Sequence, residues 1–402
     1  MDRHLNIRLV ENIFRLFLVL WILFIPLKTV FYQIAWVGLI VTFFAYCFMQ
    51  KECAKEFVAI CKHFKDVCIL FGLIIVSMVV ASLLNPAHQE VHWQWLFFYI
   101  FQYFFIFFIL LFMYRRRVYS TRFLITTIFI VLGIYAMDGI WQLSFSEDLL
   151  RHKIGSLERG LTGPTHNRNV YGMLMAITAY ISFALAIMCY RFLRKKELLF
   201  LGVLFIVALI DLLLSYSRAS WLFFFTASAI FIGLAVKKGL FNKKILFFVL
   251  SMAFGIAVLL YLSDLHLQHR FMQLLHGHSS YRLQMWPLTI EQIKKHWLFG
   301  HGLVDGNFFL YKVVSHYRYI HNSFLEVLFT VGLMGFVFYT LLLIVILREI
   351  LRLGNPLYLG LFFGFLVLFQ FDHSMIKGSI QLSILTVFAF FVFKERLKKV
   401  VL

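Results

Sequence analysis

The sequence predicts an all-α membrane protein that crosses a lipid bilayer many times. Hydrophobic residues make up 62% of the 402 residues, charged residues make up only 14%, and the mean hydropathy is +0.86. Soluble domains of this length do not have such a composition, whereas polytopic helical membrane proteins do. The apolar segments are continuous runs and do not alternate between polar and apolar residues, so a closed β-barrel is not expected.

About twelve apolar stretches, of roughly 15–25 residues each, are long enough to cross a bilayer as helices. The first is not a cleavable signal peptide, because it lacks a small-residue cleavage site. An even number of spans places both ends of the chain on the same side of the membrane. The stretches are centred near Leu20, Val41, Leu73, Tyr103, Ile130, Thr178, Ala208, Ala227, Phe254, Met334, Phe363 and Leu385.

Lysine and arginine residues indicate the orientation, because cytoplasmic loops are enriched in them. With the N-terminus in the cytoplasm, most of the 38 basic residues fall on the cytoplasmic side, including those at 51–65, 115–122, 191–196 and 394–399. Both termini are therefore expected in the cytoplasm. The net charge of +19 then faces anionic lipid, and no soluble basic domain is present to bind nucleic acid.

Residues 1–402 are expected to form one membrane domain with two sizeable outer loops, at about 143–169 and about 264–321. The second loop is the largest hydrophilic region of the chain, and we expect short helices in it. All five cysteines fall in spans or in the first inner loop, so a disulfide framework is not expected. The histidines of the second loop are loosely spaced with no thiolate near, which argues against a metal site.

One helix of the second outer loop can be predicted in detail. Pro287 suits its first turn, and Gly300 and Gly302 suit its end. Arg282 would lie just before its N-terminus, where the helix dipole attracts anions, although a solvated arginine beside an ordinary lid helix is the alternative. Apolar residues recur at helical spacing, which predicts an amphipathic helix along the membrane surface: Trp286, Ile290, Ile293 and Trp297.

Arg218 is the sharpest candidate for a functional residue. It lies in the short polar segment 215–222 between two apolar spans, so it is held at the edge of the bilayer. A guanidinium group offers a fixed fork of donors that matches phosphate oxygens and stays charged there. The alternatives are an arginine that reaches outer lipid headgroups or one that pairs with Asp211, seven residues earlier.

His321 is the candidate general base, because it directly precedes an apolar span and an imidazole titrates near neutral pH. Asn322 or Ser323 would cap the following helix, and Glu326 would orient the imidazole or satisfy a neighbouring helix. A purely structural histidine is the alternative.

Acidic residues within or near the spans are candidates by default, since a carboxylate is costly in a bilayer. Helix–helix pairing is the favoured interpretation for Asp138 and Asp211. Asp372 and His373 lie at the outer end of the eleventh span and would line the same cavity as His321. The chain has no phosphate-binding Walker loop, dinucleotide glycine pattern or nucleophile elbow, so neither a nucleotide nor a cofactor is expected.

Taken together, these features resemble the O-antigen ligase and O-antigen polymerase superfamily of bacterial envelope enzymes. The topology resembles that family over nearly the whole chain, with one large outer loop between the arginine and the histidine. The motifs that carry the resemblance are Arg218-x-x-x-Leu222, His321-Asn322 followed after nine residues by Gly332-Leu333, the turn from Gly163 through His166 to Asn169, and the stretch from Tyr281-Arg282 to Gly300-His301-Gly302.

The resemblance implies a glycosyltransferase of the bacterial inner membrane with a periplasmic site. Its donor would be a glycan on undecaprenyl diphosphate, and its acceptor a sugar hydroxyl of the lipid A–core oligosaccharide, without metal, ATP or cofactor. By match of motif, Arg218 and Arg282 would hold the diphosphate and His321 would activate the acceptor. Arg270 of the same loop is the alternative to Arg282. Asn322, Glu326, Asp211, His166 and Asp372 would support the site.

Other activities remain open from the sequence. A polymerase would use the same donor with a lipid-linked glycan as acceptor, and a third activity would attach glycans to protein. A flippase for lipid-linked sugar is the alternative outside the enzyme class. A transporter should show internal repeats and charged groups at the bilayer midplane, whereas the cations of this chain cluster at the outer mouth. The ligase, with inversion at the anomeric carbon, is therefore the preferred hypothesis.

Overall fold

The computed structural model describes residues 2–27, 29–50, 52–85, 89–152, 160–240, 265–276, 282–303, 320–371 and 380–399. Within these ranges the regular elements are helices and none is a strand, which confirms the predicted all-α fold. The chain divides into two compact units. Unit 1 comprises Met1–Ile128, Tyr281–Arg352 and Phe369–Leu402, and unit 2 comprises Phe129–Ser280 and Leu353–Leu368.

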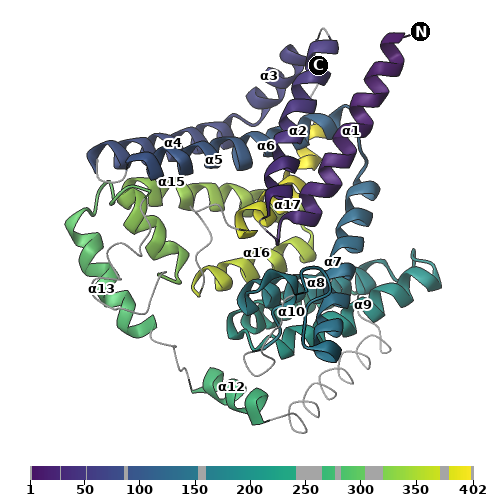
Figure 1. Ribbon diagram of the computed structural model, residues 1–402, viewed down its shortest axis with the longest axis vertical. Helices are drawn as coiled ribbons and strands as arrows, with labels where there is room; N and C mark the ends of the chain where they lie inside the picture. The colour runs from purple at the N-terminus through teal and green to yellow at the C-terminus, as the bar shows by residue number, and fades with distance from the viewer. Residues whose placement is uncertain are drawn as a thin grey trace. The chain divides into compact units, whose positions relative to one another are not determined.

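Unit 1 contains the helices from both ends of the chain (Figure 1). They are α1 (Asp2–Phe24), α2 (Val30–Met49), α3 (Cys53–His63), α4 (Lys65–Leu84), α5 (Gln89–Phe98), the π-helix η1 (Tyr99–Phe105), α6 (Ile106–Arg115), α13 (Arg282–Lys295), nearly all of α15 (Ser323–Leu353), α17 (Ile380–Phe393) and the 3-10 helix η4 (Lys394–Lys399). Helix α6 lies at the centre, because every side chain from Ile106 to Met113 is buried.

Helices α1 and α2 form a closely packed pair, which Figure 1 shows side by side. Gly38 permits the approach, since a Cβ atom at this position would lie 2.4 Å from the ring of Phe17. Small residues allow helices to pack closely in this way where apolar surroundings provide little hydrophobic drive.

An ion-pair network joins α4, α15 and η4 at one end of unit 1. Arg396 Nη1 lies 3.1 Å from Asp66 Oδ2 and 3.6 Å from Glu349 Oε1. Arg348 Nη2 lies 2.8 Å from Asp66 Oδ2, and Arg352 Nη2 lies 2.9 Å from Glu349 Oε2. Shared partners reduce the conformational freedom that each further pair must lose, so a network stabilises more than isolated surface pairs.

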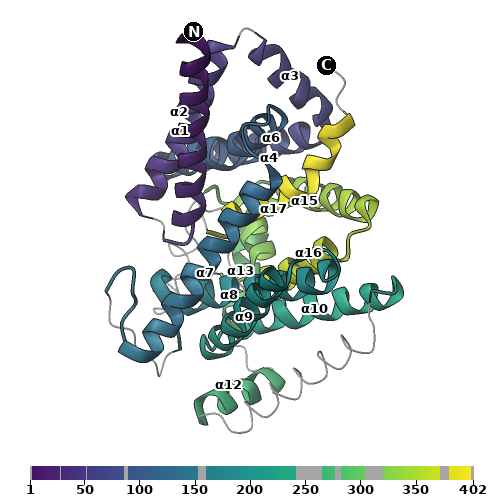
Figure 2. The ribbon, with the colours of Figure 1, turned by 90° about the vertical axis from the view of Figure 1, so that its right-hand side faces the viewer.

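Unit 2 is built around one buried helix, α8 (Arg168–Cys189), which packs against α9 (Lys195–Leu214) and α10 (Arg218–Lys237) (Figure 2). A Cβ atom at Gly360 would lie 2.1 Å from Tyr180 Oη and 2.7 Å from the carbonyl oxygen of Ala227, so α16 packs directly on α8 and α10. The remaining elements are most of α7 (Thr121–Phe145), the 3-10 turn η3 (Gly163–Thr165), α12 (Leu265–Leu275) and α16 (Pro356–Phe369).

The chain is a multi-pass membrane protein. Within the described residues, eight helices are long and apolar enough to cross a bilayer, and they coincide with eight of the stretches expected from the sequence. Helix α16 spans 14 residues, which is shorter than the roughly 20 residues a bilayer requires. Helix α17 has 14 residues within the part of the chain that the structure describes. The stretch expected near Phe254 lies outside the described residues.

Candidate functional site

Arg218 is the first residue of α10, where Ser217 is the N-cap. Its side chain is half-buried, and its Nη1 donates to the backbone carbonyl oxygen of Gln273 at 3.5 Å. Gln273 belongs to α12, and Trp221 of α10 packs on Phe271 of the same helix, with ring centroids 6.5 Å apart. The segment after Arg218 and the large outer loop are thus joined within unit 2.

Two further arginines belong to this region. Arg270 Nη1 donates to Gln273 Oε1 at 3.2 Å, so Arg218 and Arg270 converge on the same glutamine. Arg168, the first residue of α8, lies within electrostatic reach of both Arg270 and Arg218. We call Arg168, Arg218 and Arg270 the arginine cluster. Arg168 falls within the turn from Gly163 to Asn169, and its sequence position alone does not indicate a role in binding.

The arginine cluster lies where two helix N-termini meet. The Ser220 hydroxyl donates to the carbonyl oxygen of Asn169 at 3.4 Å, which links the first turn of α10 to that of α8. A Cβ atom at Gly172 would lie 2.5 Å from Ser215 Oγ, so only glycine permits this approach. The positive ends of two helix dipoles therefore add to the arginine charges, and such a location attracts anions.

The placement of these cations is unfavourable for folding alone. Cations stabilise helix C-termini, whereas Arg168 and Arg218 begin their helices. Arg168 also experiences the positive charges of Arg270 and Arg218, and like charges repel. Arrangements that break a local rule in this way are typical of functional sites, since a bound anion would relieve the repulsion.

His166 packs on an acidic residue of the first outer loop. The Nε2 atom of His166 lies 3.6 Å from Oδ2 of Asp148, whose side chain is fully buried. The backbone of His166 is left-handed, with φ of 54°. The adjoining backbone is held by Gln142 of α7, whose Oε1 accepts from the amide groups of Thr162 and Gly163 at 3.1 and 2.9 Å. His166 thus fixes this loop beside the start of α8, and its supporting role in chemistry stays a prediction.

Asp211 pairs two helices, as the sequence favoured. Its Oδ2 accepts a hydrogen bond from Tyr171 Oη of α8 at 2.8 Å, and both side chains are fully buried. Asp138 differs from the expectation of a helix–helix pair, because its Oδ1 accepts from the backbone amide of Leu150 at 3.0 Å. A carboxylate of α7 therefore anchors the outer loop rather than a second helix.

In unit 1, His321 lies directly before the N-terminus of α15. Its side chain is half-buried and its backbone is left-handed, with φ of 51°. Asn322 caps the helix as predicted, since its Oδ1 accepts from the amide groups of Phe324 and Leu325 at 3.0 and 3.1 Å. Trp286 Nε1 donates to the carbonyl oxygen of Ile320 at 3.2 Å, which ties α13 to the residue before the histidine.

Arg282 and Asn322 both bind the segment that follows α16. Arg282 Nη2 donates to the carbonyl oxygen of Phe371 at 3.0 Å, and its guanidinium carbon lies 5.6 Å from the centroid of that ring. Asn322 Nδ2 donates to Oε1 of Gln370 at 3.4 Å. The structure therefore brings Arg282 close to the His321 segment around residues 370–371. Asp372 and His373, the next residues, lie outside the described residues.

Helix α13 differs from its predicted form at its start. It already includes Arg282, so Pro287 lies inside the helix rather than in the first turn. Within the predicted apolar stripe, Ile290 and Trp297 are 42% and 56% exposed, whereas Met285 and Thr289 on another face are almost completely buried. Ile293 of the stripe is half-buried and packs against Ile320 and Phe329, and the placement of the stripe along a membrane surface stays a prediction.

Backbone hydrogen bonds join the end of the large outer loop to α15. His301 and Gly302 donate their backbone amides to the carbonyl oxygens of Phe329 and Thr330, at 2.8 and 2.9 Å. Helix α15 breaks at Gly332, whose φ of 65° and ψ of −169° suit only glycine. The motif that pairs the histidine with the later glycine therefore has a structural basis, since the break lets the loop bind the backbone of α15.

Glu326 is buried in the first turn of α15, with 5% of its surface exposed, and its assignment to the imidazole stays a prediction. Among the described residues, no three histidine, cysteine or acidic side chains come together as metal ligands do. Arg218 and Arg270 belong to unit 2, whereas Arg282, His321, Asn322 and Glu326 belong to unit 1.

Comparison with known proteins finds a match to a family model. No curated protein is similar enough to match the chain. Residues 201–340 match the family model for O-antigen ligase, and this stretch contains Arg218, Arg270, Arg282 and His321. The match agrees with the resemblance found in the sequence: this stretch of the chain is similar to the O-antigen ligase and O-antigen polymerase superfamily.

Proposed function

We propose that this protein is an O-antigen ligase that transfers a glycan from undecaprenyl diphosphate to a sugar hydroxyl of lipid A–core oligosaccharide, on the periplasmic face of the inner membrane. The observation that carries the proposal is the arginine cluster at the joined N-termini of α8 and α10. Guanidinium groups and helix N-termini match the oxygens of a diphosphate. The family match supports the same class of reaction.

In the proposed reaction, the acceptor hydroxyl oxygen attacks the anomeric carbon of the donor sugar. The bond from that carbon to the diphosphate oxygen breaks, and its electron pair leaves with undecaprenyl diphosphate. Arg218, assisted by Arg270 and Arg168, stabilises the growing negative charge. His321 accepts the proton of the hydroxyl. Attack from the face opposite the leaving group inverts the anomeric carbon.

Arg282 is proposed to contribute to diphosphate binding from the segment that also holds His321. Its guanidinium already binds the carbonyl oxygen of Phe371, so a fixed orientation is available before substrate arrives. Groups that need no reorganisation during the reaction stabilise a transition state most effectively. Asn322 fixes the backbone after His321 by capping α15.

The test is transfer by the purified protein with a defined undecaprenyl-diphosphate glycan. We expect Arg218→Ala to slow transfer by about 100- to 1,000-fold, as loss of one charge-stabilising donor does. His321→Ala should slow it by about 100- to 10,000-fold, which is the usual contribution of a general base. Two control variants are matched to these. Arg191→Ala removes an exposed arginine, and His152→Ala removes an exposed histidine that shares the left-handed backbone.

The acceptor decides between the two activities of the superfamily. Transfer to lipid A–core identifies a ligase, whereas transfer only to a second lipid-linked glycan identifies a polymerase. NMR of the product linkage tests inversion, and retention would exclude single displacement. Wild-type rates from both Arg218→Ala and His321→Ala would refute the proposed roles of these residues.

A further inference from the structure

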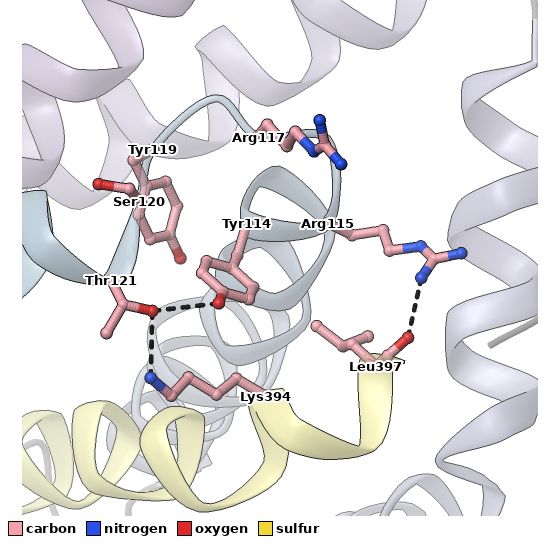
Figure 3. A pocket seen from close by; sticks show the side chains of 8 residues that line it. All are labelled: Tyr114, Arg115, Arg117, Tyr119, Ser120, Thr121, Lys394 and Leu397. Carbon is pink, nitrogen blue, oxygen red and sulfur yellow. Dashed lines mark hydrogen bonds between the residues drawn. The ribbon is translucent and has the colours of Figure 1, made fainter. Parts of the chain in front are cut away.

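Unit 1 contains a second basic site, which uses none of the residues assigned to transfer. A cavity of about 700 Å³ lies where α6 ends, α7 begins and α17 passes into η4 (Figure 3). Its eight described lining residues include three cations and four hydroxyl-bearing side chains, and none is acidic. They are Tyr114, Arg115, Arg117, Tyr119, Ser120, Thr121, Lys394 and Leu397.

Lys394 is the cation held deepest in this cavity. Only 7% of its surface is exposed, although lysine is rarely buried. Its Nζ donates to Thr121 Oγ1 at 3.1 Å and lies 5.0 Å from the centroid of the Phe391 ring, and Figure 3 shows Tyr114 pointing to the same threonine. Polar and aromatic contacts therefore fix an ammonium group in the wall of the cavity.

Two arginines add their positive charges to that of Lys394 in the wall of the cavity. Arg115 is anchored, because its Nη1 donates to the carbonyl oxygen of Leu397 at 2.8 Å. Arg117 is exposed and has a left-handed backbone, with φ of 59°, in the turn between α6 and α7. Arg15 of α1 reaches the same turn, where its Nε donates to the carbonyl oxygen of Val118 at 2.5 Å.

The N-terminus of α7 adds to this positive field. Ser120 precedes the helix, and its Oγ accepts from the backbone amide of Phe123 at 3.1 Å. A helix of 25 residues presents the positive end of its dipole here, beside the hydroxyl of Thr121. Three cations, hydroxyl groups and a helix N-terminus around one cavity match the charge and the acceptor oxygens of a phosphate ester.

The cavity also lies at the ends of two membrane spans, where lipid headgroups are expected. Two membrane spans end at it, since Trp93–Arg115 finishes there and Thr121–Phe145 begins there. Tyr114 and Tyr119 are of the residue type that concentrates at membrane interfaces. We propose that this cavity binds a phosphate ester, carried either by an anionic lipid headgroup or by a soluble phosphate. Its position at the ends of the spans favours the lipid.

The experiment measures lipid retention by native mass spectrometry on the full-length protein. One arm offers phosphatidylglycerol with phosphatidylcholine as the zwitterionic reference, and the other offers inorganic phosphate. Arg117→Gln should weaken phosphatidylglycerol binding about fivefold, and Arg117→Gln with Lys394→Gln on the order of 25-fold. Lys196→Gln removes an exposed lysine at the start of α9 and should leave binding unchanged.

The two arms separate the sources of the phosphate. Selective, variant-sensitive binding of phosphatidylglycerol supports a lipid ligand, and variant-sensitive binding of inorganic phosphate supports a soluble one. Equal binding by wild type, Arg117→Gln and the double variant in both arms would overturn the proposal. Arg117 is exposed, so its single variant decides the question even if replacement of buried Lys394 prevents folding.

Discussion

Replacement of Gly332 by alanine should break backbone contacts between the large outer loop and α15. The backbone at this position has φ of 65° and ψ of −169°, a region that is essentially open only to glycine. A Cβ atom there would also lie 2.3 Å from the carbonyl oxygen of Leu298. The neighbour in this clash is backbone, so it cannot rotate away as a flexible side chain would.

The expected loss of stability has two parts. The unfavourable backbone region costs about 1–3 kcal/mol for a residue with a side chain. Relief of the clash would separate the two segments and break two backbone hydrogen bonds between them. These bonds run from the amide of Leu333 to the carbonyl oxygen of Trp297, at 2.8 Å, and from the amide of Met334 to that of Leu298, at 3.2 Å. Each hydrogen bond contributes about 1 kcal/mol. Gly332→Ala should therefore destabilise unit 1 by about 3–5 kcal/mol.

The measurement is the half-life of the folded protein in detergent at a fixed elevated temperature, because large proteins often unfold irreversibly. If the lost contacts act mainly on unfolding, the half-life falls on the order of 100-fold or more. Gly72→Ala is the matched control, since no atom lies within 4 Å of a Cβ atom there. Alanine is favoured over glycine in a helix, so this variant should be at least as stable as wild type. A Gly332→Ala half-life within about threefold of wild type would refute the reasoning, since that corresponds to less than about 1 kcal/mol.

Two further predictions concern the segments that hold the candidate residues. Burial lowers the pKa of His301, so the folded state favours the neutral ring. The stability that the neutral ring contributes is complete above the unfolded-state pKa of about 6.5 and is lost as the pH falls through and below that pKa. The half-life of the folded protein should therefore shorten from pH 7.5 to pH 5. An equal shortening in His301→Asn would contradict this role of His301. Gln142→Leu removes the acceptor for the amide groups of Thr162 and Gly163, and should destabilise unit 2 by about 2–4 kcal/mol. The exposed hydroxyl of Ser144 provides the control, because Ser144→Ala should unfold at the wild-type rate.

Local rules identified much of the structure from the sequence. Hydropathy located the helices, because a bilayer demands long apolar runs. The cap at Asn322 was predictable, since its amide side chain satisfies backbone groups two and three residues away. Arg218 was placed correctly at a helix boundary, because polar residues interrupt two apolar runs there.

Contacts between distant segments could not be predicted in the same way. Gly332 lies in a long apolar run that reads as one continuous helix, and only the backbone of residues 297–302 reveals why the helix breaks. Met285 and Thr289 of α13 are almost completely buried although neither belongs to the apolar stripe, because burial inside the protein depends on the elements that pack against the helix. Partners remote in sequence leave no periodic signal.

The arginines illustrate the same limit at the candidate site. From the sequence, Arg270 and Arg282 were alternatives for one role, because both lie in the same outer loop. The structure assigns them different neighbours: Arg270 shares Gln273 with Arg218, whereas Arg282 binds the carbonyl oxygen of Phe371. They are therefore not interchangeable, and loss of either should not be compensated by the other. A loop supplies charged residues, but the helices on which its segments pack decide which of those charges act together.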